Sequence, residues 1–334
     1  MADTYTQVKD IVVNITTAAA AGSIGLGNPL VIQGKATAAV AYKECNSLAD
    51  VVAAGFAADT EVYKACAAIF EQDNNPKTVA VAATDGKVAD YLTANKDKDF
   101  RQVIPVLGEE DSTIAEVAQV INGLDQKMLF VACATKDELP QTQSERVVAV
   151  VYGGASAYPN AAVVGASAGL VTGSFTYKNL VIRGIEPEDL TPDQVKEVHD
   201  AGGICIVKKA GDIVTSEGIT TDGEYIDVID SKDFIVANIT YQGQKLMNNN
   251  ARITFDNVGI SQLENVVTSV LAEAFRMGII ATNEDGTPAY STTFATRAEC
   301  SDGDRAARTY NGGNFTFDLA GAIHTATING TLVI

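Results

Sequence analysis

Apolar and polar side chains alternate along the last stretch of the chain, which predicts β-strands up to its final residue. The apolar positions are Phe315, Phe317 and Leu319 in a first segment and Ala326, Ile328, Leu332 and Ile334 in a second. A period of two residues is typical of a half-buried strand. Because a chain end frays unless something holds it, a terminus with this pattern needs a sheet to join. Two interpretations stay open: a strand in the protein's own sheet, or a strand donated to a second copy of the chain by β-augmentation.

A shorter alternation of the same kind lies near the N-terminus. Ile11, Val13 and Ile15 alternate with their neighbours, and an alanine- and glycine-rich stretch follows at 18–27. Glycine permits the backbone conformations that a bend requires. We therefore predict an N-terminal arm and hinge at 1–28 and a C-terminal β arm at 311–334.

Strand and helix patterns alternate through the first half of the chain. Strands that are apolar on both faces are predicted at 30–33, 78–83, 102–107, 127–133 and 146–152, with helices at 60–72 and 112–124 among them. This alternation predicts an α/β domain with a parallel, doubly wound sheet at 29–155. Such sheets often bind ligands at the carboxyl ends of their strands. The loops there contain Asp85 and Glu109 but no recognisable catalytic set.

The second half predicts a further α/β domain at 156–310. A stretch of small residues at 158–169 indicates a helix packed closely against a neighbour. Thr191, Pro192 and Gln194 mark the start of another helix, with a capping threonine, a proline in the first turn and a glutamine that completes a capping box. A hairpin is predicted at 204–215 and helices at 231–248 and 261–277, the last with the strongest apolar periodicity.

The overall charge and the rare residue types narrow the possible functions. The 334 residues carry a formal net charge of -18, which argues against nucleic acid and anionic membranes as partners. The five cysteines form no C-x-x-C, and the two histidines, His199 and His324, give no metal-ligand spacing. The carboxylates at 222–230 do not follow the order of a calcium-binding loop. No leader, membrane span, nucleotide loop or catalytic motif is recognisable, so we predict no cofactor and no metal.

A series of short glycine- and aromatic-rich motifs runs through the second half. They are Tyr158-Pro-Asn-Ala-Ala-Val-Val-Gly165, Gly173-Ser-Phe-Thr-Tyr-Lys178, Ile182-x-Gly184, Leu190-Thr191, Gly203, Gly218-Ile-Thr-Thr-Asp-Gly-Glu-Tyr-Ile-Asp-Val228 and Lys232-Asp-Phe-Ile235. Over residues 155–334 the chain thereby resembles the tail sheath proteins of contractile phages and phage-tail-like bacteriocins. One departure is that the chain has no tryptophan, and Tyr158 and Phe234 stand where relatives often carry one.

The resemblance implies a structural subunit rather than an enzyme. Sheath subunits of this family stack as hexameric rings around a tail tube, between a baseplate and a tail terminator, and their arms add strands to neighbouring subunits. The arm residues implied here are Ile11, Val13, Ile15, Phe315, Phe317, Ile328, Leu332 and Ile334. The resemblance also implies assembly in the cytoplasm of a bacterial host, followed by a place in a virion or a released particle.

The same resemblance suggests how the two domains are oriented. The domain at 156–310 is expected to face the tube and the domain at 29–155 to face outward. On the predicted helix 261–277, the residues expected to face the tube are Gln262, Glu264, Glu273 and Arg276. The alternative is a cytosolic enzyme or a monomeric ligand-binding protein built on the doubly wound domain.

Overall fold

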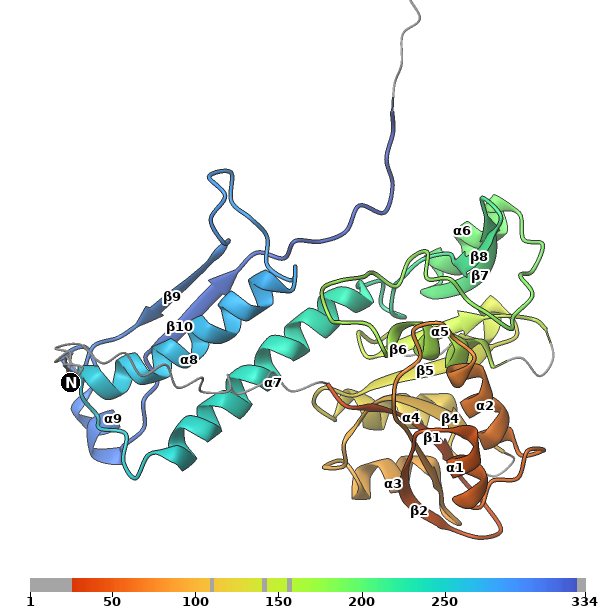
Figure 1. Cartoon of the computed structure of the whole chain (residues 1–334), viewed down its shortest axis with the longest axis horizontal. Helices are drawn as coiled ribbons and strands as arrows, with labels where there is room; N and C mark the ends of the chain where they lie inside the picture. Colours follow the sequence, from red (N-terminus) through yellow and green to blue (C-terminus); the bar gives the residue numbers. More distant parts are fainter. Residues whose placement is uncertain (1–25, 109–110, 140–142, 155–157, 329–334) are drawn as a thin grey trace, which may run out of the picture.

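A computed structural model describes residues 26–108, 111–139, 143–154 and 158–328. It has two parts, which we call the body (residues 28–225) and the lobe (residues 240–319), and the long helix α7 (Ile226–Asn249) runs from one to the other (Figure 1). The predicted arm residues Ile11, Val13, Ile15, Leu332 and Ile334 lie outside the described residues.

The body is built on one sheet of eight strands, in the order β2-β3-β1-β4-β5-β6-β7-β8. Six neighbouring strands from β3 to β7 are parallel, and antiparallel strands β2 and β8 form the two edges. The predicted doubly wound α/β fold is confirmed. The strands are β1 (Asn28–Gln33), β2 (Val40–Cys45), β3 (Val79–Ala83), β4 (Phe100–Val106), β5 (Met128–Cys133), β6 (Val147–Val151), β7 (Gly203–Lys209) and β8 (Asp212–Thr215).

Helices cover both faces of this sheet, each through an apolar stripe. One face packs against α1 (Leu48–Ala53), α2 (Glu61–Phe70) and α5 (Pro159–Ser167). The other face packs against α3 (Val88–Ala94), α4 (Ile114–Asn122) and α6 (Pro192–Asp200). A short 3-10 turn, η1 (Lys136–Glu138), follows β5. Capping boxes at Thr113 and Thr191 begin α4 and α6, and the one at Thr191 is predicted from the sequence.

The predicted close packing of the small-residue helix is confirmed in α5, where all nine residues are buried. A Cβ on Gly165 would lie 2.5 Å from the Ile69 carbonyl oxygen in α2, so only glycine allows the two helices to approach this closely.

The sheet extends across the domain boundary that the sequence suggests at 155/156. Strand β7 pairs in parallel with β6, with Ala149 opposite Gly203, and β8 extends the sheet by the predicted hairpin. Strands from both predicted domains therefore share one hydrogen-bonded sheet.

The lobe is a helical pair with a small antiparallel sheet on it. Helix α8 (Asn257–Arg276) packs beside α7, and β9 (Tyr290–Phe294) and β10 (Gly313–Phe317) lie on α8, with α9 (Asp302–Ala307) at the far end (Figure 1). Two residues of α7 that precede the lobe, Phe234 and Ile235, complete its core, whose other buried members are Val267, Leu271, Ala274, Ile279, Ile280 and Ala289.

Strand β10 contains Phe315 and Phe317. The structure pairs it with β9 of the same chain over five residues, with Phe315 opposite Thr292 and Phe317 opposite Tyr290. Phe317 also packs against the lobe core. Both phenylalanines therefore lie in a hairpin sheet within the chain, in which Phe317 is packed and Phe315 is 37% exposed.

A buried ionic network fixes α7 to the body. Arg101 in β4, whose side chain is 2% exposed, places Nη1 2.6 Å from Asp233 Oδ2 and hydrogen-bonds Asp230 through Nε at 3.2 Å. Tyr177 donates to Asp230 Oδ2 at 2.8 Å, and Arg146 pairs with Asp233. Burial and the Asp230 carboxylate raise the pKa of the Tyr177 hydroxyl well above its usual range. The network links the amino-terminal edge of the sheet to the first turns of α7.

Candidate inter-subunit surfaces

The hairpin sheet of the lobe has open edges in the part of the chain that the structure describes. Among the described residues its two strands pair only with each other, so each retains one outer edge of backbone donors and acceptors. Helix α8 covers one face, and the residues turned away from it, such as Ser291 and Thr316, are exposed and hydrogen-bonded to each other at 2.8 Å. An open edge is a template for pairing with a strand of another chain.

Helix α8 exposes a mainly polar stripe along its length. The exposed positions recur at helical spacing and are Val258, Ser261, Asn265, Ser269 and Arg276. Gln262 and Glu273 are half-buried at the margin of this stripe.

Glu264 does not belong to the exposed face of α8. Its Oε1 accepts a hydrogen bond from the Thr292 hydroxyl at 3.0 Å, so it points towards β9. The four residues expected to face a tube are therefore divided: Gln262, Glu273 and Arg276 share one side of the helix, and Glu264 is turned to the hairpin sheet.

The C-terminal segment (residues 318–328) leaves the lobe and crosses towards the body (Figure 1). Its first residues are held by backbone hydrogen bonds, from Ala281 N to Asp318 O at 2.8 Å and from Ala320 N to Ile279 O at 2.9 Å. Further along, Ile323 is 89% and Ile328 92% exposed.

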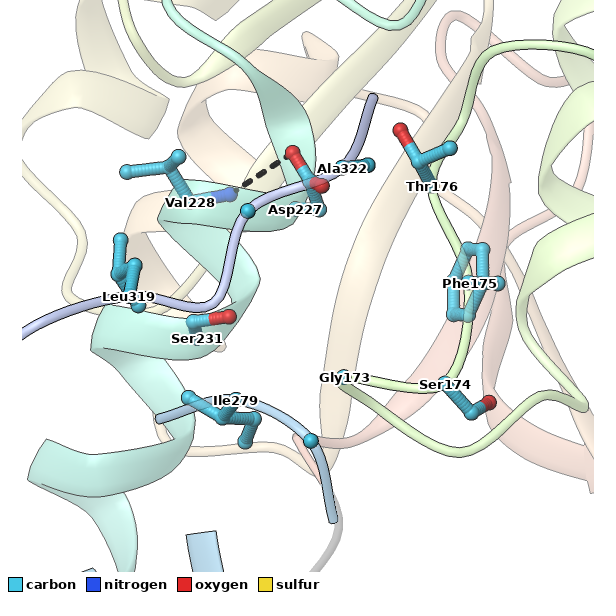
Figure 2. A pocket seen from close by; sticks show the side chains of 12 residues that line it. Gly173, Ser174, Phe175, Thr176, Asp227, Val228, Ser231, Ile279, Leu319 and Ala322 are labelled. Carbon is cyan, nitrogen blue, oxygen red and sulfur yellow. Dashed lines mark hydrogen bonds between the residues drawn. The ribbon is translucent and has the colours of Figure 1, made fainter. Parts of the chain in front are cut away.

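A cavity of about 320 Å³ lies where this segment meets the body. Figure 2 shows Phe175 and Thr176 on one side and Asp227, Val228 and Leu319 on the other. Asp227 Oδ1 accepts from the Val228 N–H at 3.1 Å, and burial raises the pKa of the Asp227 carboxyl. This one carboxylate is already engaged by its own helix, so the cavity is a gap between packed segments rather than a built ligand site.

At the carboxyl edge of the large sheet, two polar side chains bind the local backbone, while Asp111 Oδ2 is buried without a hydrogen-bond partner. Asp111 Oδ1 accepts from the N–H groups of Val88, at 3.0 Å, and Ser112, at 2.6 Å, and the Thr84 hydroxyl accepts from Gly86 N at 3.1 Å. Among the described residues, no group of three or more histidine, cysteine or acidic side chains is placed to hold a metal ion. No helix in the described part of the chain is long and apolar enough to cross a membrane.

Sequence reasoning missed two residues, His324 and Glu217. His324 Nδ1 lies 2.6 Å from Glu217 Oε1, although 107 positions separate them. One signal in the sequence could have identified His324: it stands at the alternate positions that are otherwise apolar, as Ala326 and Ile328 are.

The chain is similar in structure to solved sheath proteins. The PVC sheath complex of an extracellular contractile injection system, in its contracted state, matches with a TM-score of 0.72 and 12% identity over 99% of this chain and 98% of that chain. The chain has the fold of a contractile tail sheath protein.

Two further structures share this sheath-protein fold. The helical sheath of the anti-feeding prophage (AFP) in its contracted state matches with a TM-score of 0.69 and 14% identity over 99% of both chains. A sheath tail protein from Listeria innocua matches with a TM-score of 0.61 and 12% identity over 81% of this chain and 89% of that one. No protein-family model and no curated protein matches the chain.

Proposed function

We propose that the chain is the structural subunit of a contractile tail sheath. One observation carries the proposal: two structures of contracted sheaths match 99% of this chain, which includes both the body and the lobe. Subunits then polymerise as stacked hexameric rings around a tail tube, and contraction drives the tube through a cell envelope. The subunit is not an enzyme, and it assembles in the host cytoplasm before it becomes part of a virion or a released particle.

In this proposal the arms join one copy to the next. The open edges of β9 and β10 are the acceptor, and the strands that reach them come from the arms of neighbouring copies, which contain Ile11, Val13, Ile15, Ile328, Leu332 and Ile334. Main-chain ladders fix both position and direction of the added strand. The apolar side chains add burial at about 25 cal/mol per Å².

The rest of the particle meets the subunit through other surfaces. The exposed stripe of α8, with Gln262 and Glu273 at its margin and Arg276 within it, faces the tail tube, and the part of the body at 29–155 faces outward. Baseplate and tail terminator proteins bind the first and last rings.

Negative-stain electron microscopy of purified protein tests the proposal. Full-length protein is expected to form tubes, whereas a variant that lacks residues 325–334 remains a soluble subunit. The deletion removes only exposed residues among those described, 325–328, so its melting temperature stays within about 2 °C of the full chain. A full-length protein that remains a single 35.0 kDa species under all assembly conditions contradicts the proposal.

A further inference from the structure

His324 differs from its neighbours in the C-terminal segment. Its side chain is 12% exposed, whereas Ile323 is 89% and Ile328 92% exposed. A largely buried polar side chain on an otherwise exposed segment requires partners, and the body supplies three of them.

Each side of the imidazole ring has a contact. Nδ1 lies 2.6 Å from Glu217 Oε1, and Nε2 lies 3.0 Å from the Thr176 hydroxyl. The Tyr225 ring meets the imidazole edge-to-face at a centroid distance of 4.7 Å. A neutral imidazole that carries its proton on Nδ1 satisfies both hydrogen bonds, since the Thr176 hydroxyl can donate to Nε2.

The body holds these partners in place independently of the C-terminal segment. Glu217 pairs with Lys178 at 2.6 Å, and both side chains are nearly buried, at 14% and 13% exposed. Thr176 precedes the fully buried Tyr177, and Tyr225 is the residue before α7 begins. A preformed, polar recess thus receives one side chain of the segment.

We propose that His324 is a latch that fixes where the C-terminal arm leaves its own subunit before it reaches a second copy. The inference rests on the proposed function, and it places the flexible joint of the arm after residue 324. Gly312 and Gly313, at the start of the C-terminal β arm predicted at 311–334, lie against or in the hairpin, where Ala295 N–H donates to Gly312 O at 3.0 Å. Residues 318–320 are held by the lobe and residue 324 by the body.

The position of the latch sets the reach of the arm. The stretch 325–334 lies beyond it and spans at most about 35 Å when fully extended. Without the latch the free chain begins after residue 320, and its fourteen residues span at most about 50 Å over a much wider range of directions. Because each ordered residue costs conformational entropy, an arm that is fixed at residue 324 before assembly joins a neighbour faster.

The first test measures the latch in the soluble full-length subunit. Only two residues are histidines, so selective ¹⁵N-histidine labelling gives two backbone amides, and His199 in helix α6 serves as the internal rigid standard. We expect an order parameter of about 0.8 for both amides in the wild type. In the double variant Thr176→Val/Glu217→Gln, that of His324 falls below about 0.6 while His199 is unchanged. A mobile His324 amide in the wild type overturns the latch.

The second test measures assembly by light scattering and electron microscopy. His324→Ala is expected to lengthen the lag before tubes form by at least about threefold. The matched control is His199→Ala, which removes a histidine bound to the Ser216 hydroxyl at 2.8 Å within the body and leaves the lag unchanged. Wild-type tubes with an unchanged lag in His324→Ala overturn the role of the latch. Absence of wild-type tubes overturns the proposed function, and the labelling test then still decides whether the latch exists.

Discussion

Replacing Arg101 by methionine tests the idea that a buried charge network holds α7 to the body. The guanidinium contacts Asp230, Asp233 and the Gln126 carbonyl oxygen, and its side chain is 2% exposed. Methionine fills similar space but leaves two buried carboxylates without this partner. Loss of one member of a buried ion pair costs about 3–5 kcal/mol. Asp233 keeps Arg146 and Asp230 keeps Tyr177, so we expect the lower end, about 3 kcal/mol.

The assay is urea unfolding followed by circular dichroism, with two further variants. Lys232→Met is the matched control, because Lys232 on α7 pairs with Glu145 at 3.3 Å, but both side chains are half-exposed. It should lose at most about 1 kcal/mol. Adding Asp230→Asn to Arg101→Met should restore at least about 1 kcal/mol, since it removes the stranded charge and keeps an acceptor for Tyr177. An Arg101→Met protein as stable as Lys232→Met would refute the reasoning.

Three further predictions concern charge. Burial raises the pKa of Glu217, but the contacts with Lys178 and His324 outweigh burial and hold this pKa below 4.5. Glu217→Gln should therefore be less stable than wild type at pH 7. In denaturation curves measured over a pH series, this difference should vanish as the pH falls below 4.5 through the pKa of the folded state. Arg276→Glu should weaken co-sedimentation with tail tubes and leave tube-free polymers intact. Glu264→Lys should instead lower the melting temperature, because Glu264 accepts a hydrogen bond from Thr292 within the lobe. Moderate salt should speed polymerisation by screening the net charge of -18, and formed tubes should survive high salt in light scattering, because strand ladders depend little on ionic strength.

The sequence pattern predicts the centre of the body and the edge strand β8, but it misses the other edge strand. Strands β1 and β3 to β6 are buried on both faces, so their apolar runs are unmistakable. Strand β2 is missed because it is an exposed edge strand in which Lys43 and Glu44 interrupt the apolar pattern. Helix α7 begins at Ile226, five residues before its predicted start, since the buried Asp230 interrupts the apolar stripe. The partner of Asp230, Arg101, is 129 residues away in the sequence. An ion pair between residues so far apart produces no pattern in the neighbouring sequence.

The C-terminal pattern shows a different limit of sequence reasoning. Period-two alternation correctly predicts a strand at β10, but it cannot identify the partner strand, because β9 of the same chain and a strand of another copy satisfy the same pattern. His324 is similar: a histidine in an apolar parity position signals a polar contact, while Glu217 and Thr176 become visible as its partners only in the fold.

A cryo-EM reconstruction of the polymer tests the central claim most directly. We expect the hairpin sheet of each lobe to gain strands at the open edges of β9 and β10. Residues 325–334 of a neighbouring copy should form one of these added strands. Well-resolved subunits that contact each other only through side chains, with every arm folded onto its own lobe, would contradict the account.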